Sequence, residues 1–449
     1  MSVFQGEVYK MLDKKSRPSS IRYILLLLIC FLLFITGLQI PIISTLNTTI
    51  LLPVLAIVDK LMGWQLFSLN KSLLKQTKFI QALLILTLFC IVYWTTINDY
   101  GFLNKEASWL SYIAQIMRII FFYILGFSIN YSRLPACPYN TIIVMTSLIG
   151  STVFYSVLSV LKTLQTRPKL IEERIYLDYW TYEKLPATGV GDFLCLGLLY
   201  IVVVFYGYRH RKESQIFYIF FVLVSAIFVF FSFNITVLLQ NRLALMATAI
   251  GFVTIRFLLE FRSKLKFITL PLFAGLFALV SVGVNIIEVI VSTVLAQFGV
   301  FNERFLSEGN ESGRFDNYQI ALEKIWQYPF GGREFNLPVS KWVHNLWLDV
   351  AYDAGLLPMF LLLLYFILHI NCLFKILNSD LPKIVIVYFT TLSIGILLNM
   401  SLGPIIQGSV FEFGMTCFFL GVIARLSGEV EISKKYQLSP KIYHTNIDR

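Results

Sequence analysis

Arginines near the ends of apolar segments are the first candidates for chemistry in this sequence. Arg314 follows Ser312 and Gly313, and the apolar residues after it recur at the three- and four-residue spacing of a helix. A helix N-terminus presents free N–H groups and the positive end of the helix dipole, and a guanidinium binds phosphate through two hydrogen bonds. The position of Arg314 therefore predicts a site for a phosphate-containing ligand.

Two further arginines are expected beside Arg314. Arg304 precedes it in the same polar segment, and Arg242 lies just inside an apolar run, where a charge is costly unless it has a partner or a function. Each arginine could instead be a solvated loop residue, or a side chain that extends to the membrane surface without a function. The three arginines together are therefore stronger evidence for a site than any one of them. Arg118, in the middle of another apolar run, could line a ligand cavity or form an internal pair, and the sequence leaves both open.

His344 is the histidine expected to act as a general base. It stands where a long polar segment meets an apolar run, and an imidazole with an unperturbed pKa of about 6.5 exchanges protons near neutral pH. His210 and His444 lie in basic polar segments, and His369 is expected about 37 Å along the same helix at 1.5 Å per residue. The alternative for His344 is an interface histidine without a catalytic role.

The elements that must position these residues are transmembrane helices. The chain has 449 residues, of which 57% are hydrophobic and 14% charged, whereas about a quarter of the residues in soluble domains are charged. Apolar runs near the length of about 20 residues that crosses a bilayer predict an all-α polytopic membrane protein with twelve spans. These runs lie near 23–43, 47–62, 79–97, 108–130, 139–161, 187–208, 215–233, 237–259, 267–290, 345–370, 384–402 and 405–425.

Lysine and arginine indicate the orientation of these spans. Most of them fall in alternate segments between the runs, and the remainder are concentrated in the long segments 162–186 and 291–344. Basic residues favour the cytoplasmic side in short loops. The pattern predicts cytoplasmic termini and three regions: spans one to nine (1–290), a large external loop with short helices (291–344), and spans ten to twelve with a cytoplasmic tail (345–449).

Several other classes of function are not expected. The six cysteines lie mostly in apolar runs without a CxxC motif, which predicts buried thiols rather than a disulfide framework or a metal site. No ligand spacing in the loop 291–344 predicts a metal, and no cofactor is expected. The net charge of +11 is typical of helix-flanking lysine and arginine rather than of nucleic-acid binding.

Four short segments, in this order and with this predicted sidedness, resemble the bacterial O-antigen polymerase and O-antigen ligase superfamily. They are Leu185–Gly189; Gln240–Leu245; Ser312–Arg314 with Trp326 and Pro329–Gly332; and His344–Asn345 with Ala354–Leu356.

The resemblance implies an enzyme that acts on glycans carried by undecaprenyl diphosphate, with about twelve spans and one large periplasmic loop. It implies that Arg242 and Arg314 bind the donor diphosphate, to which we add Arg304, and that His344 is catalytic. The implied reaction is a metal-independent, inverting glycosyl transfer at the outer face of the bacterial cytoplasmic membrane. The residues expected to support the site are Asn345, Gly313 and Arg118. The expected partners are the lipid-linked oligosaccharide, membrane lipid and a chain-length regulator protein.

The match departs from the family in two places. Asn241 stands where many members have serine before the arginine. Asp349 and Asp353 follow His344 and Asn345, where many ligases have glutamate directly after that pair, and this favours a polymerase. A ligase that moves glycan onto lipid A core is the first alternative. A lipid-linked glycan flippase or transporter is the second, although it would be expected to carry charges along a central cavity.

Overall fold

The computed structural model of the chain describes residues 20–41, 43–61, 77–99, 109–128, 137–207, 215–239, 241–261, 314–331, 343, 345–403, 406 and 410–437. About 86% of these described residues are helical. In lipid each backbone N–H and C=O must find its partner inside the segment, which is why the apolar runs form helices. The elements are α2 (Ser20–Gly37), α3 (Ile43–Leu46), a π-helical turn (Asn47–Leu51), α4 (Leu52–Leu61), α6 (Thr77–Asp99), α7 (Trp109–Ser128), α8 (Cys137–Thr166), α9 (Lys169–Glu172), β1 (Ile175–Leu177), β2 (Lys184–Pro186), α10 (Thr188–Leu198), α11 (Tyr200–Gly207), α12 (Gln215–Leu238), α13 (Arg242–Phe261), α16 (Arg314–Gln327), α17 (Leu346–Ala354), α18 (Leu356–Leu377), α19 (Lys383–Leu402) and α21 (Val410–Gln437).

The protein is an all-α polytopic membrane protein. Seven helical segments in the described part of the chain are long and apolar enough to cross a bilayer: α6, α8, α10 with α11, α12, α18, α19 and α21. Helices α2 and α7 contain shorter apolar segments, and the weak second run forms three short helical pieces from α3 to α4. The predicted ninth span, near 267–290, lies outside the described residues, and the total of twelve stays a prediction.

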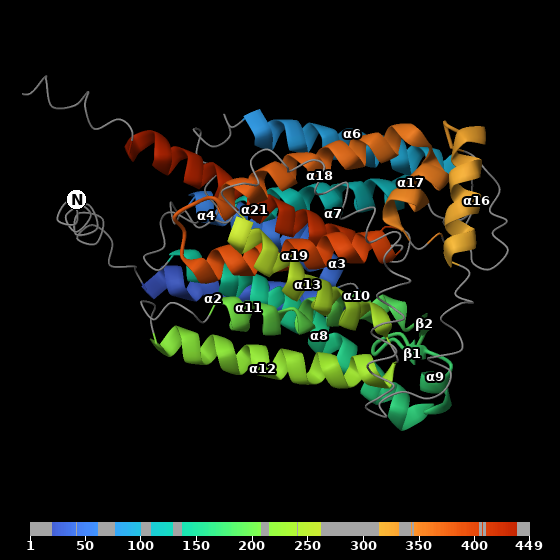
Figure 1. Cartoon of the computed structure of the whole chain (residues 1–449), viewed down its shortest axis with the longest axis horizontal. Helices are drawn as coiled ribbons and strands as arrows, with labels where there is room; N and C mark the ends of the chain where they lie inside the picture. Colours follow the sequence, from blue (N-terminus) through green and yellow to red (C-terminus); the bar gives the residue numbers. More distant parts are fainter. Residues whose placement is uncertain are drawn as a thin grey trace, which may run out of the picture.

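The helices form a bundle whose members run mostly lengthwise (Figure 1). Helices α19 and α21 form its centre, because 94% of their apolar windows is buried inside the protein, whereas α12 is peripheral at 28%. Exposed leucine, isoleucine and phenylalanine side chains on the outer helices provide the surface that faces lipid. Helix α16 lies across one end of the bundle, and α9, β1 and β2 lie at this same end (Figure 1), which we call the hairpin end.

The predicted tenth span, 345–370, is not a single helix. It divides at Gly355, whose φ of +94° ends α17 and precedes α18. Glycine adopts this left-handed region without the steric cost that other residues incur. Eight of the nine residues of α17 are buried, so α17 is a short internal helix rather than part of a lipid-facing span. The prediction of one continuous helix toward His369 is therefore wrong, because it is interrupted at Gly355. His344 lies outside the described residues.

Candidate functional site

The hairpin end contains the antiparallel strand pair β1–β2, in which Leu177 pairs with Lys184. The backbone N–H of Leu177 donates to Oγ1 of Thr163 on α8 over 2.8 Å, and the indole N–H of Trp180 donates to the backbone oxygen of Leu38 over 2.8 Å. These contacts attach the hairpin to α8 and to the residue that follows α2. They fix the segment 185–189, which runs from β2 into α10.

Asn241 brings the second resembling segment against the first. Its side-chain Nδ2 donates to the backbone oxygen of Ala187 over 3.4 Å, and its Oδ1 accepts from the N–H of Ala244 over 3.4 Å. Gly191 provides the space, because a Cβ at that position would lie 2.0 Å from Nδ2 of Asn241. Arg242 is thereby the first residue of α13, directly beside the start of α10.

The turn after α16 packs against the break between α17 and α18. The N–H of Leu356 donates to the backbone oxygen of Pro329 over 2.8 Å. Gly331 and Gly355 both have positive φ, and a Cβ on either would lie within 3 Å of the backbone of the other segment. The third and fourth resembling segments are therefore in direct backbone contact, and the predicted helix end before Pro329 is confirmed.

Helix α16 packs on α17 through a face that differs in part from the predicted one. Spacing alone indicated Phe315, Tyr318, Leu322 and Ile325. The structure buries Ile325 with Ala321 and half-buries Tyr318, but it leaves Leu322 half exposed. The contact face of α16 is centred on Ala321 and Ile325, because the small side chain of Ala321 packs directly against α17. The prediction that Leu322 belongs to this face was wrong. The side chain of Phe315 lies outside the described residues.

Asn345 caps α17 and attaches it to α19. Its Oδ1 accepts from the N–H groups of Trp347 and Leu348, at 3.1 and 3.2 Å, which is the hydrogen-bond pattern of a helix N-cap. Its Nδ2 donates to the backbone oxygen of Ser401 over 3.0 Å. The buried amide thus has partners for both of its polar atoms. The supporting role expected for Asn345 in the site stays a prediction.

Asp349 holds the residues on both sides of position 344. Its carboxylate accepts from the N–H of Val343 over 2.8 Å and from the N–H of Asn345 over 3.2 Å. His344 itself lies outside the described residues. Sequence reasoning noted Asp349 only as a departure from the ligase pattern. In a capping box, the side chain three residues after the N-cap accepts a hydrogen bond from the backbone N–H of the N-cap. Asp349 lies four residues after Asn345 and makes the same kind of bond, so this spacing was the signal that sequence reasoning could have used.

The last turns of α19 connect α10, which follows the hairpin, with α17, which packs on α16. Asn399 donates from Nδ2 to the backbone oxygen of Asp192 on α10 over 3.1 Å, and Ser401 accepts from Asn345 on α17. Two helices that are far apart in the sequence are therefore attached to neighbouring residues of one central helix. All four resembling segments consequently belong to one connected structure.

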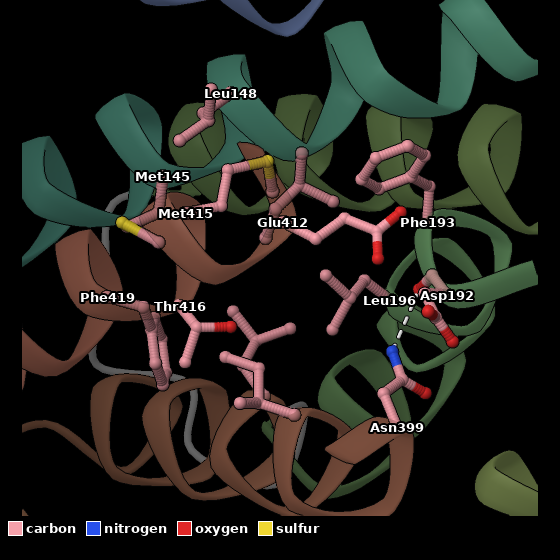
Figure 2. Close-up of a pocket in the computed structure, with 13 residues that line it drawn as sticks. Met145, Leu148, Asp192, Phe193, Leu196, Asn399, Glu412, Met415, Thr416 and Phe419 are labelled. Carbon is pink, nitrogen blue, oxygen red and sulfur yellow. Dashed lines mark hydrogen bonds between the residues drawn. The ribbon is translucent and has the colours of Figure 1, made fainter. Parts of the chain in front are cut away.

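A buried cavity lies beside this connection, between α8, α10, α19 and α21 (Figure 2). Asp192 and Glu412 line it and are hydrogen-bonded to each other through their side chains. Sequence reasoning missed this pair, because single acidic residues in two apolar runs gave no spacing to recognise.

Tyr176 of β1 lies close to the start of α10, since a Cβ on Gly189 would be 3.1 Å from its hydroxyl oxygen. Burial raises the pKa of Tyr176, and the nearby carboxyl groups of Glu412, Asp178 and Asp192 raise it further. Its phenol therefore stays neutral and retains its proton as a hydrogen-bond donor.

Arg118 lies on α7 with its guanidinium carbon 5.5 Å from the ring centroid of Phe411. Its Nε is buried and has no hydrogen-bond partner among the described residues. Within that part of the chain Arg118 forms no ion pair, so the internal pair that the sequence left open is not observed there. Arg118 remains a candidate for lining a ligand cavity.

Several predicted site residues cannot be placed. His344, Gly313 and Arg304 lie outside the described residues, as do the side chains of Arg242 and Arg314 at the first positions of α13 and α16. Across the described ranges, no three histidine, cysteine, aspartate or glutamate side chains are grouped to hold a metal ion. The predicted independence from metals stays a prediction.

The sequence matches no known protein-family model, and no curated protein matches it. The class is therefore defined by the fold: an all-α polytopic membrane protein.

Proposed function

We propose that the protein is a glycosyltransferase that polymerises oligosaccharide repeat units carried on undecaprenyl diphosphate, for O-antigen or capsule. The observation that supports this most strongly is the contact among the four segments that resemble the O-antigen polymerase and ligase superfamily. The hydrogen bond from Asn241 to Ala187 joins the first two, and the bond from Leu356 to Pro329 joins the last two. Helix α19 connects these two pairs.

In the proposed mechanism the arginines hold the donor and the histidine activates the acceptor. Arg242, Arg314 and Arg304 bind the diphosphate of the lipid-linked donor. His344 accepts the proton of an acceptor sugar hydroxyl, and that oxygen forms a bond to the anomeric carbon of the donor. The bond from that carbon to the diphosphate breaks, and its electron pair leaves with undecaprenyl diphosphate. One displacement inverts the anomeric centre.

The arginines would stabilise the charge that develops on the leaving diphosphate, the role that a metal ion has in many other transferases. No ATP is required because the donor is already activated. Asn345 and Asp349 support the base role of His344 by fixing the backbone of the residues on either side of it. Gly313 precedes Arg314 in the sequence and is proposed to support the same site. Arg118 supplies a further guanidinium, whose Nε is buried.

The proposed setting is the bacterial cytoplasmic membrane, with twelve spans and both termini in the cytoplasm. The hairpin end would face the periplasm, where the loop 291–344 completes the site. A protein that regulates chain length is a candidate partner, besides the lipid-linked substrate and membrane lipid.

One observation favours a transporter as the second candidate. Buried acidic residues inside a bundle often mark an ion or substrate pathway, and Asp192 and Glu412 fit that description. Their cavity leaves only about 30 Å³ of free space, too little for a sugar. This favours the transferase over a glycan flippase.

The surface glycan of a deletion strain tests the proposal. A polymerase defect should leave single repeat units on the lipid core, and the gene carried on a plasmid should restore long chains. Long polymer that accumulates on undecaprenyl diphosphate would identify a ligase instead. Lipid-linked single units confined to the cytoplasmic face would indicate a flippase and contradict the proposal.

A further inference from the structure

Two lysines from different spanning helices converge on one carboxylate, far from the hairpin end. Lys78 is on α6, Lys375 is on α18 and Glu431 is on α21. Lys375 lies in the last turn of α18, whereas Leu356, the first residue of α18, contacts the turn after α16. Because α16 lies across the hairpin end (Figure 1), the lysines lie at the opposite end of the bundle.

The net charge of this cluster is positive. The Nζ atoms of both lysines contact the same oxygen, Oε1 of Glu431, at 4.0 Å from Lys78 and more closely from Lys375. The two ammonium groups therefore lie near each other, and they repel. Among the described residues, Glu431 is the only carboxylate in contact with either lysine. Two ammonium groups and one carboxylate leave one positive charge in excess.

The surroundings of the lysines do not offset this charge. Glu429, one half-turn before Glu431 on α21, pairs with Arg425 over 2.8 Å, so these two residues together add no net charge. Lys78 is the second residue of α6, and the first turn of that helix has no acidic residue. The N-terminal end of a helix carries the positive end of its dipole, where a cation is unfavourable. The cluster would therefore attract an anion.

The two lysines lie where spanning helices reach the surface of the membrane. Lys78 begins one candidate span, and Lys375 lies two residues before the end of another. Their side chains are 42% and 28% exposed, so a ligand can reach both. Lysines near the ends of spans extend their ammonium groups to the level of the lipid headgroups, and basic sites between spanning helices bind anionic headgroups.

From this arrangement we infer that Lys78 and Lys375 together bind the phosphate group of an anionic phospholipid, with phosphatidylglycerol as the lipid tested. The ammonium groups donate hydrogen bonds to the phosphate oxygens, and the negative charge of the phosphate compensates the excess positive charge. By contacting both lysines, the lipid stabilises the packing of α6 against α18. The site does not depend on the proposed glycosyl transfer, since it lies at the other end of the bundle and uses none of the residues of the reaction.

The test is thermal unfolding of the purified full-length protein in nanodiscs of phosphatidylcholine alone and of phosphatidylcholine mixed with phosphatidylglycerol. We expect phosphatidylglycerol to raise the Tm of the parent by about 2–5 °C. Lys78→Gln and Lys375→Gln should each lose most of this rise. Glu431→Gln should enlarge it, because removal of the carboxylate leaves both ammonium groups without a counter-charge.

Arg256→Gln is the matched control. Arg256 is an exposed basic residue on α13 that pairs with Glu260 over 3.0 Å. This variant removes one positive charge, as the lysine variants do, and should keep the parental rise in Tm.

Three outcomes contradict the inference. The first is a parent protein whose Tm does not rise with phosphatidylglycerol, or lysine variants whose Tm rises as much as that of the parent. The second is a smaller rise for Glu431→Gln than for the parent, which would show that the lysines serve only to pair with Glu431. The third is an equal rise in Tm with inorganic phosphate in phosphatidylcholine nanodiscs, which would assign the site to a soluble anion instead of a lipid.

Discussion

The side-chain amide of Asn345 donates a hydrogen bond to the backbone oxygen of Ser401 over 3.0 Å, while its oxygen caps α17. One buried side chain therefore fixes the start of α17 and attaches it to the central helix α19. Because His344 precedes Asn345 in the chain, this contact also determines where the proposed base can lie.

Asn345→Ala should destabilise the protein by about 1–3 kcal/mol, because it removes a helix cap and leaves the Ser401 carbonyl without this donor. Asn345→Asp should restore the cap but not the donor, and it should recover only part of the loss. Thermal unfolding in detergent measures both. Asn378→Ala, which removes an amide bonded to Phe374 at the opposite end of α18, is the control. A parental Tm for Asn345→Ala would contradict the role of this contact.

Gly355→Ala should lower both Tm and polymer length. An alanine there would have a φ of +94°, and its Cβ would lie 2.6 Å from the backbone oxygen of Pro329. A residue other than glycine in this positive-φ, extended region costs about 1–3 kcal/mol, and the close contact would push the turn after α16 away from α17. Gly207→Ala is the control, since its Cβ would meet only the side chain of Ile384 at 3.3 Å. Equal Tm values for the two variants would show that the turn adjusts freely.

The break at Gly355 shows where sequence reasoning ended. Hydropathy measures polarity and not backbone conformation, so an apolar run through Ala354, Gly355 and Leu356 was read as one span. The membrane class and the start of α16 at Arg314 were predictable, because both depend on local composition and spacing.

Long-range pairs were not predictable in the same way. Asp192 and Glu412 each looked like an isolated acid in an apolar run, and only the packing of α10 against α21 brings them together. Similarly, the bond from Asn399 to Asp192 joins residues far apart in the chain. No local spacing encodes such contacts.

Arg242→Lys and Arg314→Lys should each greatly reduce glycan transfer with normal membrane insertion. Lysine keeps the charge but loses the planar guanidinium that binds phosphate through two hydrogen bonds. Arg256→Lys is a control on the same helix as Arg242, because Arg256 is exposed and pairs with Glu260 over 3.0 Å. Polymer yield relative to protein level is the measurement. Parental yield from a lysine variant would assign that arginine a structural role.

The orientation predicts which exposed positions can be labelled from outside. A cysteine at Thr181, in the hairpin loop, should react with a membrane-impermeant maleimide in cells with a permeabilised outer membrane. One at Asp380, between α18 and α19, should react only after lysis. Both native side chains are exposed, so accessibility to water is matched. The reverse pattern would place the hairpin end in the cytoplasm and contradict the proposed periplasmic site.

The most direct test of glycosyl transfer uses purified protein with an undecaprenyl-diphosphate-linked oligosaccharide in excess EDTA. We predict a ladder of longer lipid-linked glycans, with one undecaprenyl diphosphate released for each repeat added. His344→Ala should reduce the rate by about 10²–10⁴-fold, as expected for loss of a general base, whereas His444→Ala should match the parent. If the parent protein forms no ladder with or without divalent ions, or if His344→Ala forms it at the parental rate, the account is contradicted.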